Sequence, residues 1–302
     1  MLQAGKRRSK AGQYQYHLML LPGMLILLVF HYAPMFGTII AFEKFIPAKG
    51  IMGSDWAGLR YFSHLLSMPD SWRIFRNTMV IAIFKIVFNI IVPVVFALLL
   101  NEIRSVGFKR VVQTCVYLPH FMSWVVLATP IFNVFAYNGI VNDLVCFFGG
   151  TRRMFMNDVS SFRAILIATD VWKEFGFGTI VYLAAITGID PTIYEAAEID
   201  GASRFQKVLH VTLPGMLSII VLMATRSLGN VLNAGFDQIY NLYSPAVYEV
   251  SDIVDTYVYR VGLLDKNYSL STAVGLLKSV ISMTLIMTSN YLAKRFAGYQ
   301  IF

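Results

Sequence analysis

Polar residues recur at helical spacing inside two otherwise apolar stretches of the sequence. In the later stretch, Arg226, Asn230, Asn233 and Asp237 stand at offsets of 0, 4, 7 and 11 residues. This spacing predicts that the four side chains share one face of a regular helix. Charged and amide groups are costly to bury in apolar surroundings unless they face a cavity or a partner. The stretch is therefore a candidate lining for a polar path.

The earlier stretch carries Asp170, Lys173, Glu174 and Phe177 on one expected helix face, with Trp172 beside it. Hydrogen-bonding side chains, together with aromatic rings that cover apolar sugar faces, have the chemistry to bind a carbohydrate. The alternative is that these side chains only join helices, since interhelical hydrogen bonds of this kind are common. The candidate path residues are Trp172, Glu174, Phe177, Arg226, Asn230, Asn233 and Asp237.

The composition of the chain indicates an integral membrane protein. Of its 302 residues, 57% are hydrophobic and only 14% are charged, whereas a soluble protein carries about 25% charged residues. The net charge of +8 arises largely at the ends of apolar runs, which fits anionic lipid headgroups better than nucleic acid. Cys115 and Cys146 match no disulfide or metal-site spacing, and we expect neither a metal site nor catalytic residues.

Six segments approach the length of a membrane span. A spanning helix needs about 20 apolar residues at a rise of 1.5 Å per residue. We therefore predict an all-α fold with six transmembrane helices. The predicted spans are Leu18–Phe42, Thr78–Leu100, Thr114–Phe135, Ala164–Ile186, Met216–Phe236 and Thr272–Leu292.

Basic residues at the ends of the spans predict the orientation of the chain. Lys6, Arg7, Arg8 and Lys10 precede the first span, and cytoplasmic flanks are enriched in Lys and Arg. This places the N-terminus in the cytoplasm. Six spans return the C-terminus to the same side.

Charges within the predicted spans need partners or water. Arg226 lies near the middle of the fifth span and cannot be neutralised by losing its proton. We expect Glu174, at the same depth in the fourth span, to pair with it. The alternative is that Arg226 reaches water alone. Lys85 and Lys278 are isolated, and we expect them to extend to the headgroups, although Asp170 could pair with either.

A polar, Gly-punctuated insert, YEAAEIDGASRFQKVLHVTLPG, separates the fourth and fifth spans. Its local signals predict two short helices, the first capped by Asp190 and ended by Gly201 in a left-handed or closely packed position. Ser203 and Gln206 have the spacing of a capping box for the second helix. We expect Pro214, with the glycine after it, to break the chain before the fifth span.

The insert resembles the EAA loop of permease subunits of binding-protein-dependent ABC importers. That pattern is E-A-A-x3-G-x9-I-x-L-P, and the segment beginning at Glu195 departs from it only by Val211 in place of Ile. The spacing is long and strict. Val211 keeps a β-branched apolar side chain, so the departure changes little.

The resemblance extends from about Leu18 to Phe296. The stretches YLP, NGIVN and YLAA look like permeases of the carbohydrate uptake group. The C-terminal third, with GFDQIYNLYSPAVYEVSDIVDTYVYR and SLSTAVGLLKS, is similar to a subgroup of polysaccharide or lipoprotein permeases. That subgroup handles oligosaccharides from plant or host glycans, mostly in Gram-positive bacteria.

The resemblance implies that the EAA loop is a coupling helix that sits in a groove of an ATP-binding subunit. Glu195 would pair with a basic residue of that subunit, Ala196 and Ala197 would permit close approach, and Gly201 would set the turn. The coupling residues implied are Glu195, Ala196, Ala197, Asp200, Gly201 and Arg204.

The chain lacks a G-x-x-x-x-G-K-[ST] phosphate loop, so we expect it to be a transport component and not an enzyme. ATP and Mg²⁺ would be bound by the partner ATPase, with no cofactor in this chain. The partners implied are a second permease subunit in a heterodimer, two ATP-binding subunits, an extracellular solute-binding lipoprotein, an oligosaccharide and membrane lipid, without nucleic acid. The implied location is the cell membrane of a Gram-positive bacterium.

The predicted organisation is a cytoplasmic tail over residues 1–17, a transmembrane permease domain over 18–296 with a coupling loop at 190–214, and a cytoplasmic tail over 297–302. The predicted function is import of an oligosaccharide driven by ATP hydrolysis. Alternatives are an ABC permease for a non-sugar solute such as an amino acid, phosphate or metal ion, and a secondary transporter driven by an ion gradient. A membrane scaffold or sensor is a third.

Overall fold

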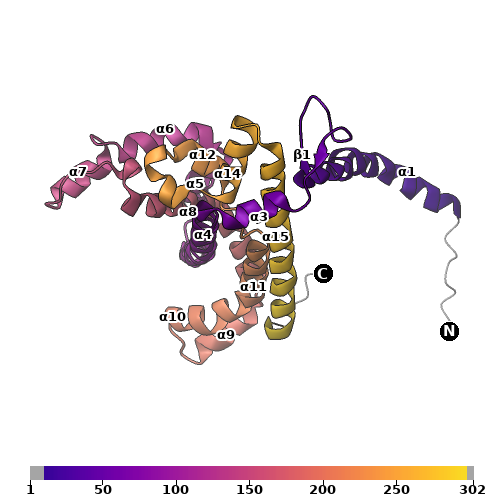
Figure 1. Cartoon of the computed structure of the whole chain (residues 1–302). Helices are drawn as coiled ribbons and strands as arrows, with labels where there is room; N and C mark the ends of the chain where they lie inside the picture. Colours follow the sequence, from indigo (N-terminus) through magenta and orange to yellow (C-terminus); the bar gives the residue numbers. More distant parts are fainter. Residues whose placement is uncertain (1–9, 298–302) are drawn as a thin grey trace.

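A computed structural model describes residues 10–297, which form helices joined by loops and one small pair of strands (Figure 1). The strands β1 (Glu43–Lys44) and β2 (Asp55–Trp56) pair antiparallel. The helices are α1 (Lys10–Leu27), α2 (Ala33–Met35), α3 (Arg60–Ser67), α4 (Pro69–Glu102), α5 (Val106–Tyr117), α6 (Trp124–Phe135), α7 (Ile140–Phe147), α8 (Val159–Thr187), α9 (Pro191–Ile199), α10 (Arg204–Lys207), α11 (Leu213–Gly229), α12 (Phe236–Leu242), α13 (Tyr248–Ser251), α14 (Val254–Tyr259) and α15 (Tyr268–Ala297).

The expected all-α membrane fold is confirmed. Within residues 10–297, five helices are long and apolar enough to cross a membrane, or six if α8 and α9, which bend by 70° at their junction, count as one broken segment. The second, fourth and sixth predicted spans lie within α4, α8 and α15. The first predicted span begins within α1. It continues through a π-helical turn, α2 and a 3-10 segment that ends at Phe42.

The third predicted span, Thr114–Phe135, is interrupted. α5 ends at Tyr117, a 3-10 turn follows, and α6 begins only at Trp124. Pro119 has no amide hydrogen to continue the α-helical ladder, and the Ser123 hydroxyl accepts from the amide of the third residue on, which caps a new helix. A count of apolar residues does not detect such a break.

Two apolar clusters hold the helices together. α4 and α8 pack along their length, and the first cluster gathers around Phe162, Leu166 and Ile239. The second lies around Tyr182 and Met216, nearer to α9. α1 projects away from the other helices (Figure 1), and its apolar side chains, for which exposure is described, are open to the surroundings.

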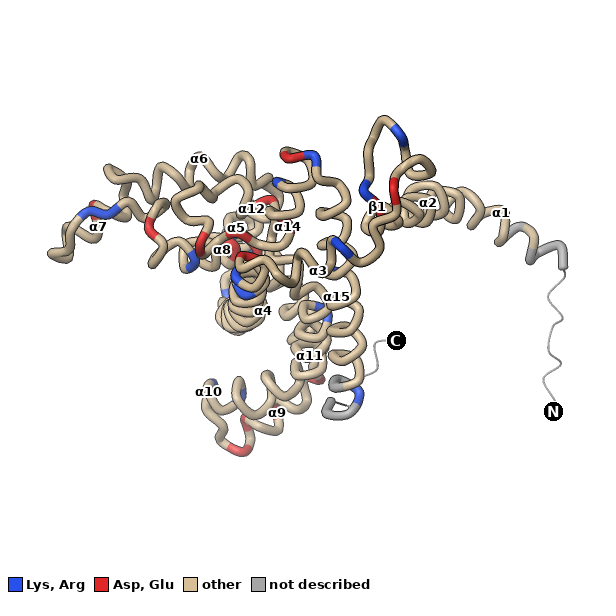
Figure 2. The backbone as a smooth tube through the Cα atoms, in the orientation of Figure 1, with Lys and Arg blue, Asp and Glu red and all other residues tan. Residues whose placement is uncertain are grey.

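Charged residues are unevenly distributed along the chain (Figure 2). Most of α1 and α6 carries no charge, whereas Lys, Arg, Asp and Glu gather in loops, at the α9–α10 turn, and where α4, α5 and α8 come together. The last of these groups lies inside the helical body and is the polar site described below.

A polar clamp holds the segment between α12 and α14 onto the long helices. Asn77 of α4 is 1% exposed, and its amide donates to the carbonyls of Glu249 and Asp252 at 2.9 and 3.2 Å. Arg163 of α8 donates to the side-chain oxygen of Asn77 at 2.6 Å and to the backbone carbonyl of Val250 at 3.0 Å. The clamp therefore joins α4, α8 and α13.

We predict that Asn77→Ala destabilises the protein, because it leaves the backbone carbonyls of Glu249 and Asp252 and the Arg163 guanidinium short of partners. A loss of about 2–3 kcal/mol is expected, which corresponds to a fall of roughly 5 °C or more in the thermal midpoint. Thermal unfolding of the purified protein in detergent measures it. The control is Asn241→Ala, whose amide donates within its own helix α12. Equal midpoints for the two variants would contradict the clamp.

Candidate functional site

The fifth predicted span ends early, and its end forms one wall of a polar pocket. α11 stops at Gly229 and α12 begins at Phe236, with irregular backbone between them. The prediction of one regular helix over Met216–Phe236 is therefore wrong. Gly235 has a φ of +96°, and a Cβ there would lie 2.8 Å from the ammonium of Lys85. The turn into α12 needs glycine for both reasons.

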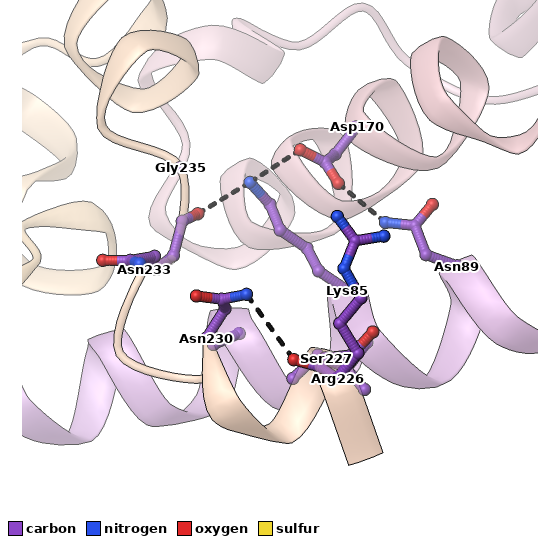
Figure 3. A pocket seen from close by; sticks show the side chains of 11 residues that line it. Lys85, Asn89, Asp170, Arg226, Ser227, Asn230, Asn233 and Gly235 are labelled. Carbon is purple, nitrogen blue, oxygen red and sulfur yellow. Dashed lines mark hydrogen bonds and ion pairs between the residues drawn. The ribbon is translucent and has the colours of Figure 1, made fainter. Parts of the chain in front are cut away.

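The ammonium of Lys85 is the centre of the site (Figure 3). It lies 3.0 Å from Oδ1 of Asp170 on α8 and donates to the Ala234 carbonyl at 2.8 Å. It also donates to the side-chain oxygen of Gln238 on α12. Oδ2 of Asp170 accepts from the Asn89 amide at 2.9 Å. One buried cation thus links α4, α8 and the break that follows α11.

Gln238 extends this network. Its amide nitrogen donates to the Leu166 carbonyl at 2.7 Å and to the Thr169 hydroxyl at 2.8 Å, both on α8. Lys85 is only 6% exposed. The expectation that it extends to the headgroups is therefore wrong, and of the two lysines considered for Asp170, the structure selects Lys85.

The pocket beside this network has a volume of about 230 Å³. Three of the four polar residues predicted to share a helix face in the fifth span do line it, although the helix ends between them. Figure 3 shows the guanidinium of Arg226 extended toward the side of the pocket that holds Asp170 and Asn89. The polar lining residues are Lys85, Asn89, Asp170, Arg226, Ser227, Asn230 and Asn233.

The expected Glu174–Arg226 pair is wrong. Among the described residues, Glu174 pairs with His120 and Lys173, and no carboxylate lies within ion-pair distance of Arg226. A charge at the centre of a membrane helix costs about 2.5–3.5 kcal/mol on insertion scales. The position of Arg226 in the last turn of α11 recovers about 0.3–1 kcal/mol through the helix dipole. Arg226 lies at the end of its helix and is exposed in this chain, so its guanidinium is open to water or to a polar partner outside the chain.

His120 is the centre of a second polar group, outside the pocket lining, that the sequence analysis missed. It lies in the break of the third span, where Nδ1 is 2.7 Å from Oε2 of Glu174 and its ring stacks on Phe177 with centroids 4.0 Å apart. Lys173 donates to the His120 carbonyl at 3.0 Å and to Glu174 at 2.9 Å. The aromatic ring of Phe121 completes the group. In the sequence, the proline of LPHF was the signal that could have predicted a break of the helix at His120.

Four of the seven candidate path residues do not line the pocket. Glu174 and Phe177 belong to the His120 group, and the other two lie elsewhere. Trp172, expected beside the polar face of α8, lines a separate apolar hollow with Phe84, Phe88 and Phe175. Asp237 is exposed on α12, past the break, rather than beside the pocket. Successive side chains on an α-helix are rotated by about 100°, so Trp172 points away from the face that carries Asp170 and Glu174. This rotation explains why Trp172 does not line the pocket.

Lys278 on α15 is also paired rather than free. Its ammonium lies 2.5 Å from Asp255 on α14 and 2.7 Å from the side-chain oxygen of Asn233. The expectation that it extends to the headgroups is therefore wrong. The contact fixes one end of the irregular segment against α15.

A cluster of aromatic rings follows the pocket along the chain. Tyr240 contacts Phe236 and Tyr259 with ring centroids 5.3 and 4.8 Å apart, and Tyr243 contacts Tyr248 at 4.8 Å. Burial, with the hydrogen bond to Tyr248, raises the pKa of Tyr243 to about 12, so this phenol stays protonated at neutral pH. The many tyrosines after position 235 were the signal in the sequence that could have predicted this aromatic cluster.

The insert between α8 and α11 folds as its local signals predict. Asp190 caps α9 by accepting from the amide of Thr192 at 2.9 Å. Gly201 has a φ of +76°. Ser203 and Gln206 form the expected capping box, each side chain bonding to the other's backbone amide. These three predictions are confirmed, because each depends on contacts between near neighbours.

One local prediction fails. Pro214 and Gly215 do not break the chain, and helical structure continues from Arg204 to Gly229 over 26 residues. A π-helical turn at Val208–Thr212 precedes the proline. Such a turn re-spaces the hydrogen-bond ladder, so the missing amide hydrogen of Pro214 is tolerated. Gly215 instead allows close packing of Ile189.

The coupling residues lie together on an exposed surface at the far end of α11 from the pocket (Figure 1). Glu195, Ala196 and Asp200 are exposed, as are the large apolar side chains of Ile199 (89%) and Phe205 (74%). The remaining coupling candidates are Ala197, which is half-buried, Gly201, which is exposed, and Arg204, which lies 3.9 Å from Glu102. This surface can receive a partner that covers apolar and acidic groups.

A family model described as the binding-protein-dependent transport system inner membrane component matches residues 89–298. The chain belongs to this family. The matched region contains every coupling candidate and every path candidate. The chain is therefore the membrane permease of an ABC transporter, a transport component that is not itself an enzyme.

Two relatives from Bacillus subtilis (strain 168) are similar over almost the whole permease. The polygalacturonan/rhamnogalacturonan transport system permease protein YteP is 42% identical, with 95% of this chain and 89% of YteP covered. Protein LplB is also 42% identical, with 93% and 88% covered.

Solved structures share the fold. A subunit of a bacterial ABC transporter that imports the acidic polysaccharide alginate superposes with a TM-score of 0.87 at 35% identity, covering 95% of this chain and 97% of that one. The same transporter in complex with alginate pentasaccharide-bound periplasmic protein gives a TM-score of 0.88 at 34% identity, covering 96% and 98%. The expected ABC importer permease fold is thereby confirmed.

We predict that Lys85 and Asp170 depend on each other. Lys85→Met leaves a carboxylate, and Asp170→Asn leaves an ammonium, in a buried position, and removal of one partner of a buried pair costs about 3–5 kcal/mol. The Lys85→Met/Asp170→Asn double variant should therefore lose less stability than the sum of the single losses. Thermal midpoints of the purified variants measure this coupling, and strictly additive losses would disprove it.

Proposed function

We propose that this permease translocates an oligosaccharide from an extracellular binding protein into the cytoplasm, powered by ATP hydrolysis in separate subunits. The observation that carries the proposal is the polar pocket at the break after α11, which is joined to the coupling surface by one helical segment. Amide, hydroxyl and charged side chains in the pocket offer hydrogen bonds to sugar hydroxyls. The name of YteP, a polygalacturonan/rhamnogalacturonan transport system permease protein, and the import of the acidic polysaccharide alginate by the transporter of similar structure support the substrate class.

The helical segment from Arg204 to Gly229 provides the coupling. Its 26 residues span about 39 Å at 1.5 Å per residue, from the α9–α10 turn to the irregular wall of the pocket. Closure of an ATP-binding subunit against the coupling surface would displace this segment as a unit. The break after Gly229 would absorb the displacement and reshape the pocket.

Partners follow from the exposed surfaces. We propose a second permease subunit, in a heterodimer, as the partner for the apolar sides of α1 that stand free of this chain. Two ATP-binding subunits, which bind ATP and Mg²⁺, would cover the coupling residues. A solute-binding lipoprotein would deliver the substrate, and the alginate transporter in complex with its loaded periplasmic protein supports this part.

The multi-pass chain would lie in the cell membrane of a Gram-positive bacterium with both termini in the cytoplasm. The end of α15 lies on the same side as α9 and α10 (Figure 1), which supports a cytoplasmic C-terminus. Lys6, Arg7 and Arg8, which motivate the orientation of the N-terminus, lie outside the described residues.

The function is tested by uptake into proteoliposomes that hold the assembled importer. Oligogalacturonate or oligoalginate with its binding protein should accumulate only when ATP is supplied. Uptake that continues without ATP and collapses with an uncoupler would instead indicate a secondary transporter.

We predict that Glu195→Ala lowers substrate-stimulated ATPase activity at least about tenfold without loss of membrane insertion. The reason is loss of a charge-assisted contact with the ATP-binding subunit. Glu249→Ala, which removes an exposed carboxylate distant from the coupling loop, is the control. Normal ATPase stimulation in Glu195→Ala would exclude the assigned role.

Gly201 gives a second test of coupling. We predict that Gly201→Val impairs ATPase stimulation because a β-branched residue strains the φ of +76°. Gly201→Asn should retain most of the stimulation, since Asn tolerates left-handed backbone. Equal activities of the two variants would show that the backbone conformation at this turn does not matter for coupling.

We predict opposite accessibility for two exposed positions in the orientation proposed. In a background without Cys115 and Cys146, Ser203→Cys should react with an impermeant thiol reagent only after permeabilisation, and Ala246→Cys should react in intact cells. Both positions are exposed in the chain. Labelling of both from one side would overturn the orientation.

A further inference from the structure

Arg226 stands apart from the other charges inside the spans. Lys85 pairs with Asp170, Lys173 with Glu174, and Lys278 with Asp255. For Arg226, no carboxylate of residues 10–297 lies within 4.0 Å and its guanidinium makes no hydrogen bond within the described chain. A guanidinium cannot be neutralised by losing its proton, and the Arg226 side chain is exposed in this chain, so it is open to water and to a counter-charge from outside the chain.

Asp170 is not available to Arg226. Its Oδ1 is engaged by the Lys85 ammonium and its Oδ2 by the Asn89 amide. The pocket is lined by two cations, Lys85 and Arg226, against the single carboxylate of Asp170. One positive charge is left over, and it belongs to the side chain without a partner.

The pocket places the cationic side chain of Arg226 beside amide side chains. Asn89 lines the same pocket, and its Oδ1, which is buried, has no hydrogen-bond partner within the described chain. A buried polar atom without a partner is unusual. A carboxylate fits the guanidinium, because it accepts two bonds from the planar fork of donors.

We propose that Arg226 is a specificity-determining residue that binds the carboxylate of an acidic sugar residue. Asn230, Asn233 and Ser227 line the same pocket and donate hydrogen bonds to, or accept them from, the sugar hydroxyls. This inference rests on the proposed function, and it adds that the site distinguishes acidic from neutral substrates. A neutral sugar would leave the guanidinium without a counter-charge.

A carboxylate of the second permease subunit is the other source of the same chemistry. In that case Arg226 would hold the two subunits together, and its loss would affect assembly regardless of the sugar. The two sources differ in what an Arg226 variant does to the complex and in whether the effect depends on the charge of the sugar.

The test measures the affinity of the assembled importer, in nanodiscs without its binding protein, for trigalacturonate and for its carboxyl-reduced counterpart of equal length and linkage. The wild-type complex should bind the acidic sugar more tightly. Arg226→Gln should weaken binding of the acidic sugar about 10- to 100-fold, as expected for loss of a charge-assisted contact, and leave the reduced sugar nearly unchanged. Arg226→Lys should lie between, because it keeps the charge without the fork.

The matched control is Lys44→Gln, which removes one exposed positive charge outside the pocket. It should leave both affinities unchanged. An equal loss for both sugars in Arg226→Gln, or an unchanged preference, would overturn the inference while leaving oligosaccharide transport intact. Failure of both Arg226 variants to assemble with the second subunit would also overturn it and assign the counter-charge to that subunit. A wild-type importer that takes up neither sugar from its binding protein would contradict the proposed function itself.

Discussion

The buried ammonium of Lys85 is the interaction on which the centre of the molecule depends. A lysine taken out of water is stable only if most of its donors are satisfied, and here the acceptors come from three separate segments: Asp170 on α8, Ala234 in the break, and Gln238 on α12. The dependence is mutual. An unwound membrane helix leaves carbonyls without amide partners, and Lys85 supplies a donor to one of them. The charge stabilises the break, and the break provides the charge with acceptors.

The break gives the continuous helix on its other side a mechanical role. From Arg204 to Gly229 the backbone stays helical through a proline, because the preceding π-helical turn accommodates the missing hydrogen bond. A displacement at the α9–α10 turn meets no interruption of the helix until it reaches Gly229, since the π-helical turn is itself helical. The first place that can absorb it is the wall of the pocket, which carries Arg226 and Asn230. Coupling and substrate sites are thus far apart in space and share one element.

Sequence reasoning succeeded where structure depends on near neighbours and failed where it depends on distant ones. The caps of α9 and α10 and the left-handed Gly201 follow from contacts within a few residues, so their residue types suffice. Hydropathy located the spans, because it measures average composition over about 20 residues. The same average cannot detect a break of six residues, such as those in the third and fifth spans. Nor could it place Trp172, whose neighbours on α4 are defined only by helix packing.

The wrong pairing of Glu174 with Arg226 has the same origin and shows how the breaks are built. Depth was counted along straight helices, whereas each break changes the register of the chain beyond it. At each break, a lysine from a neighbouring unbroken helix donates to a carbonyl of the break and pairs with a carboxylate of α8. Lys173 of α8 contacts the His120 carbonyl and Glu174. Lys85 of α4 contacts the Ala234 carbonyl and Asp170. The two acids are one helical turn apart on α8, so this unbroken helix serves both breaks. A charge in an apolar helix therefore indicates more than a partner charge. At Lys85 and Lys173 it also accompanies irregular backbone in a neighbouring span, because that backbone offers the free carbonyl that completes the shell of the buried ammonium.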